Sequence, residues 1–251
     1  MFRKGSIVLL VAICLCRTVS AQVNMKDSSA SGFLVGISYA AELPAGDLAK
    51  RFGFNNNIQL AVSYKTSNNW IFGIKGEYIF GDVLKESNIL DSIATKDGNV
   101  IGNNGTYPQI TYFERGWDVQ LSAGRLFPWG KNPNSGIIAI ASVGYIQHFI
   151  NIQIQGGQYT PQLTGDYLNG YDRLTAGVCV SEFVGYLYLG NNRITNFFAG
   201  FDFTQGFTKS LRFDFNTMQM DTKLRFDLLN GIRVGWILPI FKQAATAFYT
   251  H

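Results

Sequence analysis

Apolar and polar side chains alternate along much of the chain beyond residue 30. In the segment 57–66 the odd positions are polar or small, and the even positions up to residue 64 are apolar: Ile58, Leu60, Val62 and Tyr64. Successive side chains of a strand point to opposite faces, so this segment has one apolar face and one polar face. The pattern therefore predicts a β-strand.

The same alternation recurs in eight segments. They span approximately residues 33–41, 57–66, 69–81, 113–127, 136–150, 173–189, 194–207 and 224–240. Beyond residue 21, the chain has no run of the roughly 18 apolar residues that a membrane-spanning helix needs. The pattern thus predicts an all-β fold.

The connections between the predicted strands alternate in length. Three are short, at residues 67–69, 128–135 and 190–193, and four are long, at 42–56, 82–112, 151–172 and 208–223. Short periplasmic turns that alternate with long outer loops are typical of outer-membrane barrels. An even number of strands would place both the N- and the C-terminus in the periplasm.

Two architectures accommodate strands with one apolar face: a soluble sandwich with that face inside, and a membrane barrel with that face outside. The apolar face is rich in aromatic residues, and Trp70, Trp117 and Trp236 are candidates for the aromatic girdles at the membrane interfaces. The other face carries small residues and isolated charges, which suits a narrow lumen. The sequence therefore predicts an eight-stranded antiparallel up-and-down transmembrane β-barrel over residues 32–251.

The first 21 residues have the pattern of a cleaved signal peptide. Arg3 and Lys4 precede an apolar stretch that is too short to span a bilayer, and small residues lead up to Ala21. We expect cleavage between Ala21 and Gln22, followed by a short, mobile periplasmic lead at residues 22–31. A lipoprotein signal is the weaker alternative, because Cys14 and Cys16 follow bulky residues.

Composition narrows the range of functions. The chain is 47% hydrophobic but only 15% charged. Loss of Arg3, Lys4 and Arg17 with the signal would reduce Lys+Arg from 21 to 18 against 17 Asp+Glu, so the chain has no net basic charge that predicts a nucleic-acid partner. Only Cys179 would remain of three cysteines, and the chain has two histidines. We therefore expect no disulfide framework, metal site or cofactor.

Strand number, alternation and unequal connections together make the chain resemble the small OmpA/OmpX-type outer-membrane barrels, over nearly all of residues 32–251. A narrower similarity, to outer-membrane barrels of Bacteroidota, rests on short motifs: Pro44-Ala45-Gly46-Asp47-Leu48 with Phe52-Gly53, Tyr64-Lys65-Thr66, Asn69-Trp70, Phe72-Gly73 and Tyr78-Ile79-Phe80-Gly81. Several such barrels accompany large export or assembly machines. The resemblance thus implies an accessory-subunit role, by analogy of fold.

Charged residues on the inward face form a candidate lumen network. Its members are Lys75, Glu77, Asp118, His148, Asp202, Asp227 and Arg233. Eight strands enclose a bore that side chains just fill, and an unpaired buried ion costs several kcal/mol. We therefore expect similar numbers of positive and negative groups that pair, as Arg233 with Asp202 across the last hairpin. A narrow or gated ion path is the alternative.

Catalytic chemistry has one candidate base, His148 on the fifth predicted strand. Ser142 is on the same face but about 20 Å along the strand, too far for a hydrogen bond. Asp118 on the neighbouring strand could reach His148 in a suitable register. No local motif marks a nucleophile, so we expect no enzyme activity.

Glu182 departs from the pattern of the sixth predicted strand, because alternation places it among lipid-facing residues. A carboxylate in the middle of a bilayer costs about 2–4 kcal/mol or becomes protonated. We therefore expect a β-bulge near Ser181 that changes the register.

The long loops are the remaining candidates for function. The loop at 82–112 is richer in apolar residues than a disordered loop requires, and the loop at 151–172 contains Tyr159, Tyr167 and Tyr171. We interpret the chain as a non-enzymatic barrel that serves as a structural or accessory interaction subunit, in contact with outer-membrane lipid and a protein partner. A small channel and an outer-membrane lipid-modifying enzyme stay open as alternatives.

Overall fold

The computed structural model describes residues 29–157, 159–190 and 194–241. The expected signal peptide, its cleavage site between Ala21 and Gln22, and all but residues 29–31 of the expected lead lie outside the described residues. So do residues 242–251 after the last strand.

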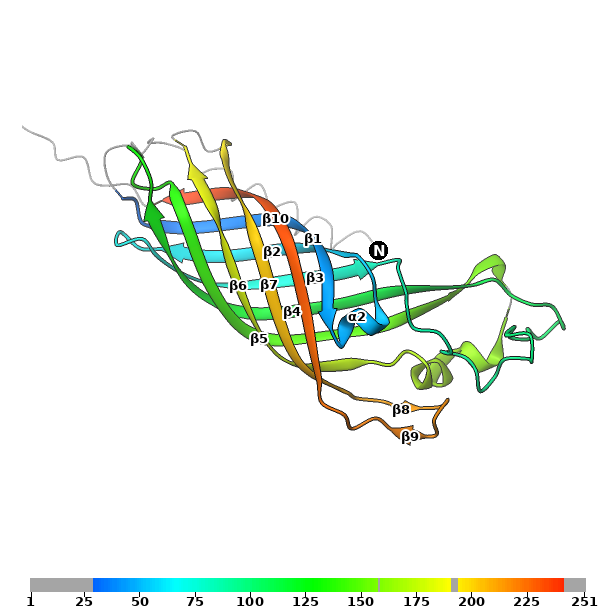
Figure 1. Ribbon diagram of the computed structural model, residues 1–251. Coiled ribbons are helices and arrows are strands. Elements are labelled where there is room, and N and C mark those ends of the chain that lie inside the picture. Colours follow the sequence, from blue (N-terminus) through cyan, green and yellow to red (C-terminus); the bar gives the residue numbers. More distant parts are fainter. Residues whose placement is uncertain (1–28, 158, 191–193, 242–251) are drawn as a thin grey trace, which may run out of the picture.

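Eight long antiparallel strands close into a barrel (Figure 1). They are β1 (Gly32–Gly46), β2 (Asn55–Lys65), β3 (Trp70–Gly81), β4 (Ile110–Pro128), β5 (Gly136–Ile154), β6 (Thr175–Leu189), β7 (Asn196–Ser210) and β10 (Arg225–Phe241). Each strand pairs with its neighbours along the chain, and β1 closes the barrel against β10. The predicted fold class is confirmed: an eight-stranded antiparallel up-and-down transmembrane β-barrel.

The strands are strongly staggered around the barrel. Following register partners from Ala45 of β1 through all the other strands returns to Val35 of β1, a stagger of ten residues. Stagger and strand number together set the tilt of the strands and the width of the bore. The bore is therefore one that side chains can fill.

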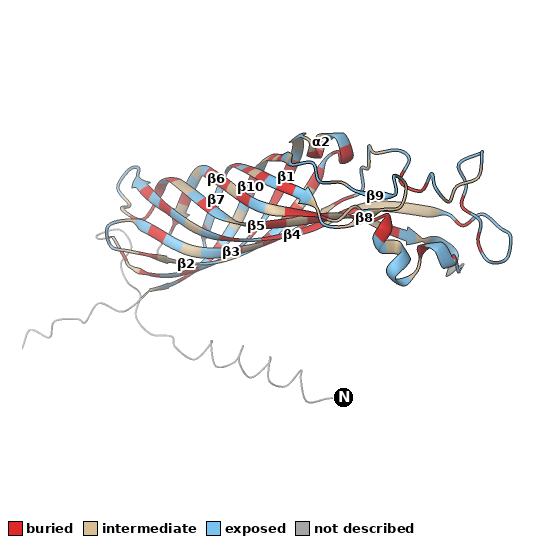
Figure 2. Cartoon of the chain, turned by 90° about the horizontal axis from the view of Figure 1, so that it is seen from below, coloured by how far each residue is buried: buried red, intermediate tan, exposed pale blue. Residues whose placement is uncertain are grey.

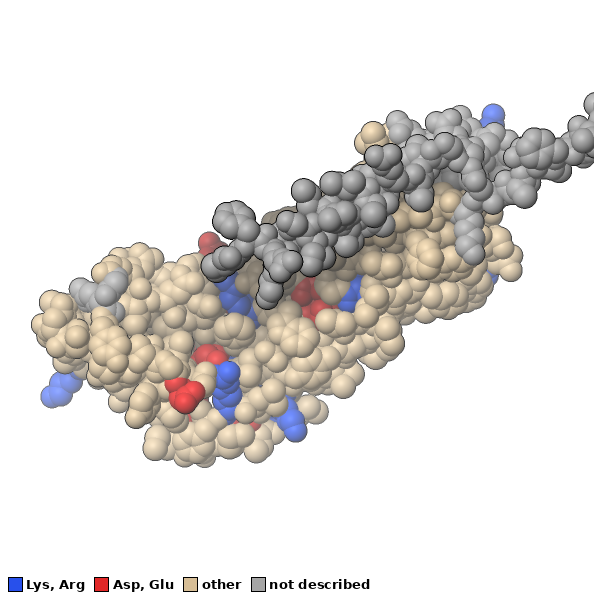
Figure 3. All heavy atoms as spheres, turned by 180° about the vertical axis from the view of Figure 1, so that it is seen from behind, with Lys and Arg blue, Asp and Glu red and all other residues tan. Residues whose placement is uncertain are grey.

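Alternation has the expected direction, with apolar side chains on the outside. Exposed and buried residues succeed one another along each strand (Figure 2), and Trp70, Trp117 and Trp236 all lie outward. On the face shown in Figure 3, charged residues are scattered over a mostly uncharged surface. Such an exterior fits a hydrocarbon environment.

Side chains inside the barrel form three layers. An apolar layer near the short turns, here called the turn-end layer, contains Leu34, Ile71, Leu126, Ile138, Phe183, Leu187 and Ile237. A second apolar layer, the loop-end layer, contains Leu48, Phe52, Ile79, Ile146, Ile150, Cys179 and Leu229 together with residues of the long loops. Charged and amide side chains lie between them.

Short elements cap the loop end. Helix α2 (Leu48–Arg51) buries Leu48 and Arg51 against the barrel. The loop between β5 and β6 contains η1 (Gln155–Gly157), η2 (Pro161–Leu163) and η3 (Gly165–Gly170), and the loop between β7 and β10 contains the hairpin of β8 (Phe213–Asp214) and β9 (Gln219–Met220). None of the helices in the described ranges is both long enough and apolar enough to cross a membrane.

Strands β4 and β5 extend past their neighbours as a two-stranded ribbon (Figure 1). Their pairing runs to Ile110 opposite Ile154, whereas β3 stops at Gly81 opposite Glu114 and β6 begins at Thr175 opposite His148. The strands predicted from the sequence, which began at residue 113 and ended at residue 150, were therefore too short at this end.

The bulge expected near Ser181 is absent from β6. Ser181 pairs with Ser142 on one side and Thr204 on the other, and Glu182 pairs next in line with Ala141 and Phe203. The register is continuous, so the prediction was wrong and Glu182 keeps its outward direction. A neighbouring side chain, rather than a change of register, accommodates it, as described below.

The described end of the expected lead is bound to the turn end. The Lys65 ammonium donates to the Ala30 carbonyl at 2.9 Å, and the Ala30 N–H donates to Asn134 Oδ1 at 2.9 Å. Ser29 donates from its hydroxyl to Asn69 Oδ1 at 2.8 Å. Residues 29 and 30 are thus anchored, contrary to the expectation of mobility.

Candidate functional site

Arg233 of β10 lies at the centre of the lumen. Its Nε donates to Asp202 Oδ2 at 2.7 Å, and one of its terminal nitrogens donates to Glu77 Oε2 at 2.8 Å. A further contact of 3.2 Å reaches the hydroxyl of Ser38. One guanidinium therefore joins four strands, β1, β3, β7 and β10, from the inside.

One further ion pair extends this network, and a separate hydrogen-bonded set joins β4 to β6. Lys75 Nζ lies 2.9 Å from Glu77 Oε1, on the same strand. Gln120 donates to Asp118 Oδ1 at 2.9 Å and accepts from the Ser181 hydroxyl at 2.7 Å. Each charge expected in the lumen on β3, β4 and β7 thus has a polar partner.

His148 pairs with Asp227, not with Asp118. Its Nε2 lies 3.0 Å from Asp227 Oδ2, and the Thr208 hydroxyl donates to the same carboxylate oxygen. The register explains why, because Gly116 rather than Asp118 lies opposite His148. His148 is buried beside Phe52, with the two ring centres 6.0 Å apart. Among the described residues, the groups around it therefore do not form a hydrolytic triad.

Two buried acids were missed by the sequence analysis. Glu42 accepts a hydrogen bond from Asn57 Nδ2 at 2.7 Å, and Glu114 accepts one from Asn55 Nδ2 at 2.9 Å. On the described strands of the barrel, the buried acids Glu42, Glu77, Glu114, Asp118, Asp202 and Asp227 outnumber the buried basic residues Lys65, Lys75, His148 and Arg233. The expected balance of charges was therefore wrong. The inward phase of β1 and β4 is the signal that could have identified both acids.

Three carboxylates come close enough to resemble a cation site. Oxygen atoms of Glu42, Glu77 and Asp202 lie within 4.8 Å of one another. Arg233 already supplies the positive charge there, since it is paired with both Glu77 and Asp202. Glu77 and Asp202 are therefore explained as the counter-ions of one buried guanidinium, and Glu42 accepts its hydrogen bond from Asn57.

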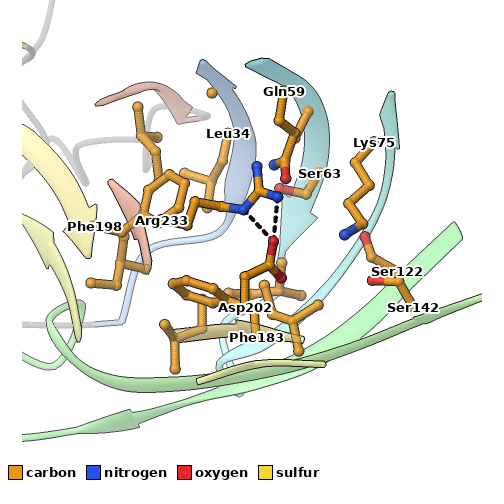
Figure 4. A pocket seen from close by; sticks show the side chains of 17 residues that line it. Leu34, Gln59, Ser63, Lys75, Ser122, Ser142, Phe183, Phe198, Asp202 and Arg233 are labelled. Carbon is orange, nitrogen blue, oxygen red and sulfur yellow. Dashed lines mark hydrogen bonds and ion pairs between the residues drawn. The ribbon is translucent and has the colours of Figure 1, made fainter. Parts of the chain in front are cut away.

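A cavity of about 80 Å³ separates the polar layer from the turn-end layer (Figure 4). Arg233 and Asp202 meet along one part of its wall, and Lys75, Ser122 and Ser142 line another. Phe183 and Phe198 pack edge to face, with ring centres 5.5 Å apart. The cavity is enclosed by strands and has the size of a few water molecules.

The long loops pack together into one head. Asn216 in the β7–β10 loop donates to the Asn88 carbonyl at 2.9 Å and accepts from the Ser92 N–H at 3.1 Å. Tyr171 in the β5–β6 loop packs against Phe215 with ring centres 5.5 Å apart. Three loops that are distant in sequence are therefore fixed to each other.

An open groove of about 600 Å³ lies on this head. Three loops line it, with Ser92, Ile93, Pro161, Gln162, Tyr167, Tyr171, Phe215 and Met218. The lining is mostly apolar and aromatic, and Tyr167 and Met218 are 66% and 71% exposed. Of the three tyrosines noted in the sequence of the loop at 151–172, Tyr167 and Tyr171 line the groove.

Ion pairs secure the head to the barrel rim. Arg51 and Arg173 both pair with Glu86, Arg225 pairs with Asp221, and Arg212 lies 2.8 Å from Asp172. Burial raises the pKa of Asp172 to about 6, although the nearby Arg212 acts in the opposite direction. The four arginines are therefore engaged by acids of the loops.

Comparison with known proteins gives similarity of shape alone. No family model and no curated protein matches the chain. Among solved structures, Neisserial surface protein A has 11% identity and a TM-score of 0.44, and 84% of this chain covers 99% of it. The attachment invasion locus protein Ail of Yersinia pestis has 10% identity and a TM-score of 0.41, and the match covers 82% of this chain and 99% of Ail. The N-terminal β-barrel domain of Pseudomonas aeruginosa OprF has 14% identity and a TM-score of 0.35, and the match covers 82% of this chain and 97% of that domain.

Proposed function

We propose that the chain is a non-enzymatic outer-membrane β-barrel whose loop head binds a protein partner. The observation that carries this proposal is the groove on the head. A fixed, solvent-open hollow lined by Tyr, Phe, Met and Ile is unusual for a loop cluster whose only task is to close a barrel. Aromatic residues and methionine are enriched in protein interfaces. Single apolar residues scattered over a surface are common and indicate no interface, whereas a contiguous apolar patch does.

The chemistry of the groove favours an extended or helical segment with apolar side chains. Tyr167 and Tyr171 offer hydroxyl groups beside their rings, so both apolar contact and hydrogen bonding are available to a partner. Met218 has a flexible thioether that adapts to irregular partner surfaces. A lipid tail would use the apolar part of this surface but not the hydroxyl groups.

The channel alternative has less support from the geometry. Two apolar layers cross the bore, one on each side of the paired charges. The lipid-modifying alternative rests on His148, which is 1% exposed and is bonded to Asp227. The proposal has further parts that rest on the signal pattern and the motif resemblance. They are location in the outer membrane with both termini in the periplasm, kinship with Bacteroidota barrels, and an accessory role in an export or assembly machine.

Point substitutions test the groove better than loop deletion. The deletion of residues 86–108 would remove Ile89, Leu90 and Val100, which are buried in the loop-end layer, and would therefore disturb the head itself. The double variant Tyr167→Ala with Met218→Ala changes only exposed side chains. Tyr107→Ala is the matched control, because Tyr107 is exposed on the same head but does not line the groove.

The measurement is chemical crosslinking in native outer membranes followed by mild-detergent purification. We expect the wild type and Tyr107→Ala to yield the same crosslinked species, and the double variant to lose at least nine-tenths of it while it keeps the folded gel mobility. Equal yields from all three proteins would contradict binding through the groove. Recovery of the wild type as a soluble periplasmic protein would contradict the whole proposal.

A further inference from the structure

A polar pair lies on the lipid-facing wall of the barrel. Glu182 is the midpoint of the 15-residue strand β6, and its carboxylate accepts a hydrogen bond of 2.8 Å from the Gln205 amide of β7. Outward residues on both sides of Glu182 along β6 are Val180 and Val184, and Phe203 lies across on β7. The pair is thus surrounded by apolar side chains at the middle of the span.

This pair keeps unused hydrogen-bonding capacity. Gln205 has a second N–H and a carbonyl oxygen, and Glu182 has a second carboxylate oxygen, and no other described residue bonds to them. Hydrocarbon supplies no donor or acceptor, so these groups are costly if lipid covers them. By contrast, the outward mid-strand residues Leu60, Val62 and Ile74 of β2 and β3 are all apolar. The polar pair belongs to one side of the barrel.

We infer that the wall formed by β5, β6 and β7 is an interface between two copies of this chain in the membrane. The pair is self-complementary about a two-fold axis parallel to the membrane normal. Such an axis brings the Glu182 carboxylate of one copy to the Gln205 amide of the other, twice. Interfaces with this symmetry use the same surface on both subunits, and polar side chains contribute to association within lipid.

The shape of the wall agrees with this symmetry. On the β5 side of Glu182 the outward residues are small, Ala139 and Ala141, and on the β7 side they are large, Phe201 and Phe203. A two-fold axis between β6 and β7 places β7 of each copy opposite β6 of the other, next to β5. The phenylalanines of one copy would then fill the space beside the alanines of its mate. Small residues at such sites allow two backbones to approach closely.

Cysteine crosslinking in the native membrane tests the interface directly. In a Cys179→Ala background, Val184→Cys places a thiol on the lipid-facing side of β6 and Leu60→Cys places one on β2, on the other side of the barrel. We expect a short bifunctional thiol reagent to convert Val184→Cys to a dimer of twice the chain mass and to leave Leu60→Cys monomeric. Equal crosslinking of both variants would mean random collision and would overturn the inference, as would a crosslink to a different protein.

Substitutions of the pair separate a specific interface from one held only by apolar contact. The dimer dissociation constant is measured in lipid vesicles from energy transfer between labelled copies. We expect Glu182→Leu with Gln205→Leu to raise this constant at least tenfold. Glu182→Gln keeps a hydrogen-bonding side chain and should remain within about threefold of the wild type. Leu60→Val is the control on the opposite wall and should have no effect. A monomeric wild type would refute the self-association, and an unchanged Glu182→Leu/Gln205→Leu double variant would refute an interface built on the polar pair.

Discussion

Arg233 of β10 donates a hydrogen bond of 2.8 Å to Glu77, which lies on β3, three strands away around the barrel. The bond crosses the bore instead of following the wall. Because Arg233 also pairs with Asp202 of β7, the guanidinium links opposite parts of the barrel. Strands on opposite sides of the lumen are therefore connected through one buried side chain.

Arg233→Ala should destabilise the barrel more than any single substitution of an exposed loop residue. The change leaves Asp202 without its cation in a buried site, whereas Glu77 retains Lys75 at 2.9 Å. We expect a loss of roughly 3–5 kcal/mol in the free energy of unfolding. Urea unfolding in detergent or lipid, followed by tryptophan fluorescence, measures it.

Replacement of both partners should recover much of that loss. In Arg233→Met with Asp202→Leu, neither charge remains to be buried alone, and the apolar chains fill similar space. A double variant as unstable as Arg233→Ala would show that bulk, rather than charge pairing, is what the site requires.

Planar bilayers with the purified wild type should show no steady conductance. The loop-end layer and the turn-end layer both cross the bore, and the cavity between them is only about 80 Å³. Conductance recorded over minutes at moderate voltage tests this. A constant single-channel current at several salt concentrations would favour the channel alternative.

His148→Ala should lower stability without loss of partner retention. The substitution removes the imidazole that lies 3.0 Å from Asp227, and only Thr208 then donates to that carboxylate. A loss of about 1–3 kcal/mol is expected for a buried polar group deprived of a partner. Loss of the crosslinked species at full stability would point instead to a chemical role for the histidine.

Acid should weaken the contact between Asp47, which precedes helix α2, and Phe226 of β10. A hydrogen bond from Lys50 and one from the Phe226 N–H hold the pKa of Asp47 down at about 2, from its ordinary 3.8. The stabilising contribution of the ionised Asp47 is therefore complete above pH 3.8 and is lost as pH falls toward 2. The protection of the Phe226 amide from hydrogen exchange, relative to the intrinsic rate at each pH, should fall over this range.

Asp47→Asn provides the control for the acid effect. The variant should show fast exchange at Phe226 at neutral pH and little further change on acidification. If exchange in the wild type does not respond between pH 4 and pH 2, the Asp47 carboxylate is not what holds this contact.

The strands could be predicted because alternation is a local property of the sequence. Their ends were harder to predict, as the ribbon of β4 and β5 shows. The lipid-facing odd positions of β5 are mainly apolar as far as Phe149, but beyond it they become polar (Asn151, Gln153), whereas the even positions Ile150, Ile152 and Ile154 pack inward with the loop-end layer. The apolar face thus changes sides where the membrane contact ends. That change ended the pattern at residue 150 and concealed four further residues of the strand.

The partners of charged residues depend on register and closure, which alternation does not determine. Asp202 and Arg233 lie on paired strands, so their contact followed from topology. The contact of His148 with Asp227 crosses the bore between strands that are not paired, and it needs the three-dimensional structure. The groove was beyond prediction for the same reason, because it forms only when three separate loops pack together.

The pairing of β1 with β10 has a consequence for how the chain folds. These strands join through a continuous register from Gly32 opposite Phe241 to Gly46 opposite Asp227. The β1–β10 pairing therefore connects the first and last strands of the barrel, which are the farthest apart in sequence. One edge of β1 stays open until the last strand has been synthesised. Contacts this remote in sequence form slowly. The barrel can consequently close only when the last strand is present, and loss of that strand would leave an open sheet with two unpaired edges instead of a smaller barrel.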